Sequence, residues 1–168
     1  KCLIIDLDAG AGATVHLGVS TTAFAGSLEL MLDPNVLAID LAIVEKMPRG
    51  VSLIPARKQL TFLEKEIGKF THPADLLQGP LEKLRPHFDF IFCDTPPQPA
   101  APTTVAAYAA VDWFLLSVFP HYLAIRGIKE AFDDIADVRE QKNPNLEVLG
   151  VVICNVDDRT SSGKELEQ

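Results

Sequence analysis

The sequence predicts an α/β fold in which a mostly parallel sheet is flanked by helices. Four long apolar runs, rich in β-branched and aromatic residues, alternate with segments of helical periodicity. Two of these runs end in aspartates that glycines or prolines follow. Strands that alternate with helices form parallel sheets with right-handed crossovers. The 168 residues are enough for one core, so we expect a single domain over residues 1–168.

Composition limits the functions that this chain can perform alone. Its net charge is -8 and its basic residues are scattered, so no basic patch for DNA is predicted. No apolar run approaches the roughly 20 residues of a membrane span. The three cysteines lie in separate apolar runs without metal-ligand spacing. These features favour a cytoplasmic protein with reduced cysteines.

The first strand is predicted at Cys2–Ile5, and Asp6 and Asp8 follow it directly. A glycine-rich turn then leads into a short helix at residues 14–17. A dinucleotide-binding turn is not expected, because Val15 stands where the third glycine of G-x-G-x-x-G belongs. Two carboxylates would also repel a pyrophosphate at this position.

The middle of the chain predicts several helices and one short strand. Helices are expected at residues 27–32, 36–45, 57–70 and from residue 73 to just before Pro86, with a strand at residues 51–55. The run at 36–45 is assigned to a helix because its apolar residues form one broad face that only Asp40 interrupts.

A second strand with a terminal carboxylate is predicted at residues 90–93, fully buried and ending at Asp94. Pro96 and Pro97 prevent a helix from starting at once, which leaves Asp94 in an exposed loop. Open α/β sheets bind ligands at the carboxyl ends of their strands. An apolar strand ending in Asp is typical of the Walker B motif, in which the carboxylate holds Mg²⁺ through water. The alternative is that Asp94 caps the following turn or helix.

Asp6 and Asp8 are expected to face Asp94 across neighbouring strand ends, an arrangement that suits a hydrated magnesium ion. Beyond this edge the sequence predicts a small-residue helix at 103–110, a buried strand at 112–118 with Trp113 in the core, the longest helix at 122–139 and a last strand at 148–154.

The order of the motifs resembles the ParA family of chromosome- and plasmid-partitioning ATPases, which are P-loop proteins related to MinD. The resembling segments cover almost the whole chain and read IDLDAGAGAT, VSLIPA, FDFIFCDTPP, DWFLLSVFPHYLAIRG and NPNLEVLGVVICNVDDRT. The resemblance implies a P-loop NTPase-like fold with ATP and Mg²⁺ as cofactors.

By this resemblance Asp94 would hold a magnesium-bound water and Asp8 would orient the attacking water. Asn155 and Asp157, in the segment 155–158, would lie near the adenine. The family forms an ATP-bound homodimer that binds DNA non-specifically, and a ParB-like partner stimulates hydrolysis. A cytoplasmic, nucleoid-associated protein is therefore implied.

Three departures from the family pattern qualify these expectations, and one of them follows Asp94, where the family's glycine is replaced in an alanine- and proline-rich loop at residues 98–102 and its asparagine by Val105. The phosphate-binding K-G-G-x-G-K-T loop is absent from the 168 residues, and with it a piece of about 30 residues that includes a central strand. The chain begins at Lys1 in a predicted strand, so we expect an internal fragment truncated at both ends. The first switch motif, D-P-Q-G-N-A-T in the family, reads DAGAGAT from Asp8 to Thr14 and lacks the Gln and Asn side chains.

Two other interpretations remain open at this point. The chain could be a non-catalytic ParA-like interaction or positioning protein with degraded switch motifs. It could also be a receiver-like domain whose Asp6 and Asp8 bind magnesium beside a phosphorylated aspartate, although the double proline after Asp94 does not suit that fold.

Overall fold

The computed structural model divides the chain into two compact units, Lys1–Ala110 and Val111–Gln168. It describes residues 1–22, 25–43, 47–66, 73–98, 100–119 and 124–155. The positions of the two units relative to each other are not determined, so each unit is described by itself. The single domain expected over residues 1–168 stays a prediction.

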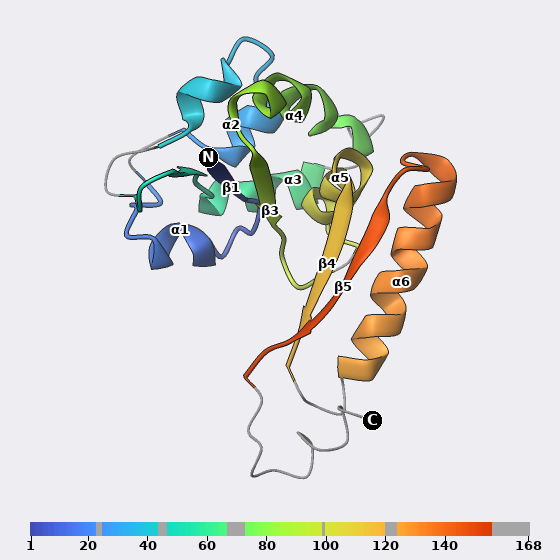
Figure 1. The fold of residues 1–168 in the computed structure, drawn as a ribbon. Coiled ribbons are helices and arrows are strands. Elements are labelled where there is room, and N and C mark those ends of the chain that lie inside the picture. Colours follow the sequence, from blue (N-terminus) through green and yellow to red (C-terminus); the bar gives the residue numbers. More distant parts are fainter. Residues whose placement is uncertain (23–24, 44–46, 67–72, 99, 120–123, 156–168) are drawn as a thin grey trace. The chain divides into compact units, whose positions relative to one another are not determined.

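The first unit is built on a three-stranded parallel sheet in the order β2-β1-β3 (Figure 1). Its strands are β1 (Cys2–Asp6), β2 (Val51–Ile54) and β3 (Phe90–Asp94). β1 lies in the middle, which explains why Leu3 and Ile5 have no exposed surface. The predicted parallel α/β fold is confirmed, and the carboxyl ends of all three strands meet at one edge.

Helices and short 3-10 turns complete the first unit. They are α1 (Gly12–His16), α2 (Ser27–Leu32), η1 (Ala38–Leu41), η2 (Lys58–Leu60), α3 (Thr61–Glu66), η4 (Pro73–Asp75), α4 (Gln78–Leu84), η5 (Arg85–His87) and α5 (Pro102–Ala110). The alanines of α5 let it pack closely against η4, α3 and α4, and nearly all of its residues are buried. The predicted helix at 103–110 is thus confirmed with one residue added.

The helix predicted at residues 36–45 is wrong. Its described part, residues 36–43, forms only the single turn η1, and then the chain extends so that Ile43 pairs with Leu53 of β2 in an antiparallel bridge, while residues 44 and 45 lie outside the described residues. Two backbone hydrogen bonds fix this bridge, Ile43 N to Leu53 O at 2.8 Å and Leu53 N to Ile43 O at 3.0 Å. Pairing with a strand edge therefore overrides the helical periodicity of the apolar residues.

The predicted helix at 57–70 is also divided, into η2 and α3, and residues 67–70 lie outside the described part. The segment from Pro73 to His87 is likewise broken into η4, α4 and η5. Gly79 and Pro80 lie in the first turn of α4, where a missing backbone N–H costs no intrahelical bond.

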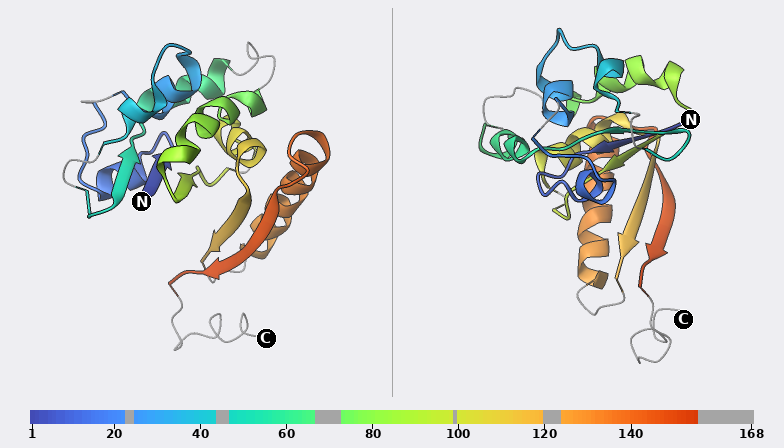
Figure 2. Two further views of the ribbon diagram at one scale, coloured as in Figure 1. Left: turned by 45° about the horizontal axis from the view of Figure 1, so that its top comes forward. Right: turned by 90° about the vertical axis from the view of Figure 1, so that its left-hand side faces the viewer.

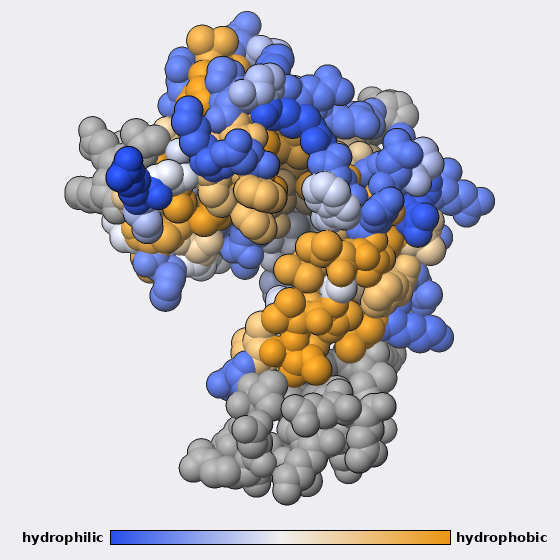
Figure 3. All heavy atoms as spheres, in the orientation of Figure 1, coloured by the Kyte–Doolittle hydropathy of each residue, from blue (hydrophilic) through white to orange (hydrophobic). Residues whose placement is uncertain are grey.

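The second unit contains β4 (Trp113–Val118), α6 (Ala124–Gln141) and β5 (Glu147–Ile153). β4 and β5 pair in parallel, and α6 runs alongside them (Figure 2). Ala131, Ile135 and Val138 of α6 are buried, as are Phe114 and Val118 of β4. The face of the two strands in Figure 3 is strongly apolar.

Two expectations about burial are wrong. β3 was predicted to be fully buried, but Phe90 and Phe92 are 65% and 55% exposed because β3 is the outer strand of its sheet. Trp113 was predicted to lie in the core and is 58% exposed. In the described ranges, no helix is long and apolar enough to cross a membrane.

Candidate functional site

The candidate site lies where β1 and β3 end side by side. In the parallel register of these strands Asp6 is the partner of Asp94, and the Leu7 N–H donates to the Asp94 carbonyl oxygen at 2.8 Å. The pairing continues to the last residue of each strand. Asp8, two residues beyond the end of β1, therefore shares this edge with Asp94, as predicted from the sequence.

Asp6 is fully buried, and three hydrogen bonds use its carboxylate. Thr14 donates its backbone N–H and its hydroxyl group to Oδ2, at 2.8 and 2.7 Å, and the Asp8 N–H donates to Oδ1 at 3.1 Å. Such bonds satisfy a buried carboxylate that would otherwise be costly. Asp6 thus holds α1 and the Asp8 loop against the sheet.

The Thr14 hydroxyl group connects a third segment to this arrangement. It accepts a hydrogen bond from the backbone N–H of Ala56 at 2.9 Å, just after β2. Thr14 and Ala56 are both buried. Asp6, Thr14 and Ala56 therefore form a buried polar brace, and of the predicted carboxylate pair only Asp8 keeps its carboxylate outside it.

The loop after Asp8 is held in a tight turn. The Gly10 N–H donates to Oδ1 of Asp8 at 2.8 Å, and the Ala11 N–H donates to the Asp8 carbonyl oxygen at 2.8 Å. Ala11 has φ 54 and ψ 39, the left-handed conformation that a residue with a Cβ seldom adopts. The carboxylate of Asp8 is half-buried and retains a free oxygen for a further contact.

Asp94 is exposed in a negatively charged setting. Partial desolvation raises the pKa of its carboxyl group, and the nearby carboxylates of Asp6 and Asp8 raise this pKa further. Within the described part of the chain no group donates a hydrogen bond to this carboxylate, which does not favour the capping interpretation. The ion pairs found among the described residues likewise do not involve Asp94.

Glu29 and Arg57 support the site, and the sequence analysis missed both. Glu29 Oε2 accepts a hydrogen bond from the Gly26 N–H at 2.7 Å, while its Oε1 pairs with the Arg57 guanidinium group. The Ser27 N–H donates to the Pro55 carbonyl oxygen at 2.9 Å. These contacts fix the start of α2 beside the segment after β2. A glutamate three residues after Gly26 was the one available signal.

The two residues expected near a nucleotide base follow β5 in the second unit. Asn155 is exposed and has φ 56, and the preceding Cys154 N–H donates to the Val118 carbonyl oxygen at 2.7 Å. Asp157 lies outside the described residues. The predicted role of both residues stays a prediction.

The residues at the β1 and β3 edge fit a hydrated metal ion better than a fully coordinated one. Among the described residues no group of three or more His, Cys, Asp and Glu side chains could hold a metal ion. A divalent cation would compensate the charges that raise the Asp94 pKa. Mg²⁺ is suited to such a site, since it keeps several waters and takes one or two carboxylates.

A protein family described as AAA domain matches residues 1–148 of the chain. The chromosome partitioning protein ParA of Caulobacter vibrioides is 28% identical over 168 residues, which are 99% of this chain and 62% of that protein. The sporulation initiation inhibitor protein Soj of Bacillus subtilis is 26% identical, over 97% of this chain and 64% of Soj. The chain thus spans somewhat less than two thirds of these relatives.

Solved structures repeat the fold closely. The cobyrinic acid a,c-diamide synthase of Mycobacterium smegmatis, with bound ATP analogue and magnesium, has a TM-score of 0.88 and 25% identity over 99% of this chain and 67% of that one. A plasmid partition protein of Borrelia burgdorferi has a TM-score of 0.78 and 24% identity over 99% of this chain and 70% of its own. The second of these shows the fold alone.

Proposed function

The chain belongs to the AAA domain family and, within it, to the ParA type of partitioning ATPases, and from this we propose that the full-length protein is an ATP-dependent dimerisation switch. In this proposal the ATP-bound homodimer positions a cargo such as a chromosome or plasmid. A ParB-like activator and non-specific DNA are the proposed partners, and the proposed location is the cytoplasm, on the nucleoid when DNA is bound.

The observation that carries the proposal is the meeting of Asp8 and Asp94 at one sheet edge. The register of β1 and β3 holds the two residues there, and the charge of Asp8 helps to raise the pKa of Asp94. We assign Asp94 to a magnesium-bound water and Asp8 to the orientation of the attacking water. Mg²⁺, when bound, would supply the positive charge that balances the phosphates.

The buried brace gives Asp8 a defined position for this role. Thr14 and Asp6 fix the base of the loop, while the Gly10 N–H fixes one oxygen of the Asp8 carboxylate. The other oxygen is then available to accept a hydrogen bond from the attacking water molecule. A fixed hydrogen-bond acceptor would accelerate hydrolysis by holding the attacking water in the reactive geometry.

The triphosphate would be held elsewhere in the full-length protein. The described loop that follows β1 presents the Asp8 carboxylate and no lysine, so it offers phosphates no positive charge. The K-G-G-x-G-K-T loop of the family is proposed to supply the backbone N–H groups and the lysine. Asn155 and Asp157 are proposed to contact the adenine.

The test uses the full-length protein with Asp8→Ala and Asp94→Ala, and with Asp40→Ala as a matched control, since Asp40 is an exposed residue of η1. Asp8→Ala is expected to retain ATP binding and dimerisation while hydrolysis falls about 100-fold or more. Asp94→Ala is expected to lose magnesium-dependent ATP binding. Sedimentation with and without ATP measures the dimer, and phosphate release measures turnover.

A non-catalytic positioning protein is the second candidate. It is favoured by the first switch loop, where Gly10 and Gly12 replace the Gln and Asn of the family pattern and contribute no side chain. Binding of ATP and dimerisation without measurable hydrolysis in the unmodified protein would favour this candidate. Hydrolysis that disappears in Asp8→Ala would exclude it.

A further inference from the structure

A partly buried ion pair joins α2 to the sheet edge that carries Asp8. β2 runs parallel to β1 and ends at this edge, so the segment that follows β2, Pro55 to Arg57, lies there as well. The side chains of Arg57 and Glu29 are 21% and 27% exposed, and they form an ion pair. Glu29 belongs to the first turn of α2. The pair therefore connects this helix to the end of β2.

Stability alone does not explain the pair. Taking two charges out of water is costly, and replacing such a pair by apolar side chains of similar size often leaves a protein as stable or more stable. Among the described residues, the buried Nε atom of Arg57 also has no hydrogen-bond partner. A buried donor without an acceptor destabilises the folded state. What the pair provides is a fixed position for the residues beside it.

α2 holds the chain on both sides of Ala56. On one side the Ser27 N–H donates to the Pro55 carbonyl oxygen at 2.9 Å, and on the other side the guanidinium group of Arg57 pairs with Glu29. Ala56 itself has no exposed surface. Its backbone N–H is therefore directed by the contacts that α2 makes with the residues before and after it.

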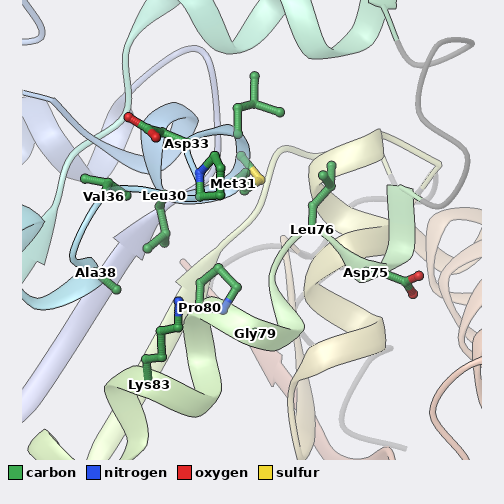
Figure 4. A pocket seen from close by; sticks show the side chains of 12 residues that line it. Leu30, Met31, Asp33, Val36, Ala38, Asp75, Leu76, Gly79, Pro80 and Lys83 are labelled. Atoms are coloured by element: carbon green, nitrogen blue, oxygen red, sulfur yellow. The ribbon is translucent and has the colours of Figure 1, made fainter.

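α2 is a firm support because both of its ends are anchored. At its start the Gly26 N–H donates to Oε2 of Glu29 at 2.7 Å, which holds the carboxylate in the first turn. Further along, Leu30 and Met31 are 3% and 7% exposed, and Figure 4 shows both on the wall of a half-open cavity between α2 and α4. Moving α2 off its site would expose these two apolar side chains, which is unfavourable.

The Ala56 N–H connects this support to Asp8. It donates to the Thr14 hydroxyl group at 2.9 Å, and that hydroxyl group donates to Oδ2 of Asp6 at 2.7 Å. The other oxygen of Asp6 accepts the Asp8 N–H at 3.1 Å. Hydrogen bonds that form a chain in a buried environment strengthen one another. A continuous series of contacts thus leads from Arg57 to the loop of Asp8.

We propose that Arg57 and Glu29 are positioning residues for Asp8. Their ion pair fixes Ala56, and the buried brace then holds the Asp8 loop against the sheet. This role rests on the proposed function, because the position of Asp8 affects turnover only if Asp8 orients the attacking water. A displacement of about 1 Å in a catalytic group can lower a rate about 100-fold, so a modest shift of Ala56 is enough to be measured.

Two variants break the pair and a third keeps it. Arg57→Met retains a long side chain without the charge. Glu29→Gln retains an oxygen for the Gly26 N–H without the charge. Arg57→Lys keeps a cation that can still pair with Glu29. The matched control is Lys58→Met, which removes the same charge from the next residue, an exposed one.

Phosphate release by the full-length protein measures the effect on turnover, with activity referred to the concentration of ATP-binding sites so that unfolded protein does not count. Arg57→Met and Glu29→Gln are each expected to lower kcat about tenfold. The KM for ATP and the ATP-dependent dimer seen in sedimentation should change less than about twofold, since neither residue would contact the nucleotide. Arg57→Lys should recover most of the loss, and Lys58→Met should leave kcat unchanged.

Urea unfolding without nucleotide measures the connection to Thr14 independently of turnover. Residues in one hydrogen-bond network do not act additively. The shift in urea midpoint caused by Arg57→Met should therefore shrink about twofold or more in the Thr14→Val background. Leu81→Ala, in the core beside α2 and within α4, is the additive control, and its shift should be the same in both backgrounds. Circular dichroism establishes that each variant is folded.

Two outcomes would overturn the inference and leave the proposed function intact. The first is a kcat per site that neither Arg57→Met nor Glu29→Gln changes, in a protein whose Asp8→Ala variant has lost hydrolysis. The second is a midpoint shift for Arg57→Met that is the same with and without Thr14→Val. An unmodified protein that binds ATP without hydrolysing it would overturn the proposed function together with this inference.

Discussion

Thr14 donates both its backbone N–H and its hydroxyl group to the same oxygen of the buried Asp6 carboxylate. The residues are eight positions apart, so these two bonds close the loop that carries Asp8. The hydroxyl group also accepts the Ala56 N–H, which extends the connection to the segment after β2. The position of the proposed catalytic carboxylate thus depends on a neighbour that would not itself contact nucleotide.

Thr14→Val is expected to destabilise the protein by about 2–4 kcal/mol, because it removes a donor to Asp6 and the acceptor of Ala56 while the shape of the side chain is kept. Urea unfolding measures the change in free energy. Thr14→Ser retains the hydroxyl group and should recover most of the loss. A loss below about 0.5 kcal/mol in Thr14→Val would contradict the role of this hydroxyl group.

Asp94→Asn is expected to stabilise the protein at neutral pH in the absence of ATP and Mg²⁺. The pKa of Asp94 is raised in the folded state, so the folded protein binds this proton more tightly than the unfolded chain. The ionised group therefore opposes folding above its folded-state pKa, and the penalty disappears as the pH falls below the unfolded-state pKa.

The measurement for Asp94→Asn is the midpoint of urea unfolding at pH values from about 3 to 8, a range that includes the usual pKa values of carboxyl groups. The variant should be more stable than the unmodified protein at the upper end of this pH range and equally stable at the lower end. Asp40→Asn, at an exposed residue of η1, is the control. Equal stability of Asp94→Asn and the unmodified protein at every pH would remove the charge argument for this edge.

Ala11→Gly is expected to stabilise the protein by about 1 kcal/mol, because Ala11 is held at φ 54. The first switch motif of the resembled family has glycine at this position. Ala13→Gly, two residues further on and inside α1, should instead cost about 0.5–1 kcal/mol. An unfolding temperature that rises in Ala11→Gly and falls in Ala13→Gly would establish the strain at Ala11. Changes of the same sign in both variants would argue against it.

Gly26→Ala is expected to destabilise the protein by about 2–4 kcal/mol. An added Cβ would lie 2.0 Å from the Pro55 carbonyl oxygen, which accepts the Ser27 N–H at 2.9 Å. The start of α2 would have to move away from β2 and strain the Glu29–Arg57 pair. Gly127→Ala, in open space within α6, should raise stability slightly under the same conditions.

The sheet edge could be predicted because its signals are local. An apolar strand that ends in Asp is visible within ten residues at Asp94 and again at Asp6 and Asp8. Parallel pairing then brings the two ends together without further information. The sequence could not predict that Asp6 is buried in the brace while Asp8 keeps its carboxylate accessible, since this depends on which carboxylate Thr14 donates to.

The other failures arise from partners distant in sequence. Ile43 is not helical because it pairs with Leu53 at the edge of β2, and Arg57 forms an ion pair with Glu29, which lies 28 residues earlier in the sequence. The burial expected of Phe90 and Trp113 assumed neighbours on both sides of each strand. β3 has a neighbour on one side only in its three-stranded sheet, and β4 pairs with β5 alone in its two-stranded sheet.

Hydrogen exchange at the buried brace can also measure how often the Asp8 loop opens. The Ala56 amide proton points at the Thr14 hydroxyl group inside the protein, so water can reach it only when the loop from Asp8 to Thr14 swings off the sheet. Its hydrogen–deuterium exchange rate would then report how often that opening occurs. One resonance in a nitrogen–proton spectrum would follow the motion of the Asp8 loop without any label on the loop itself.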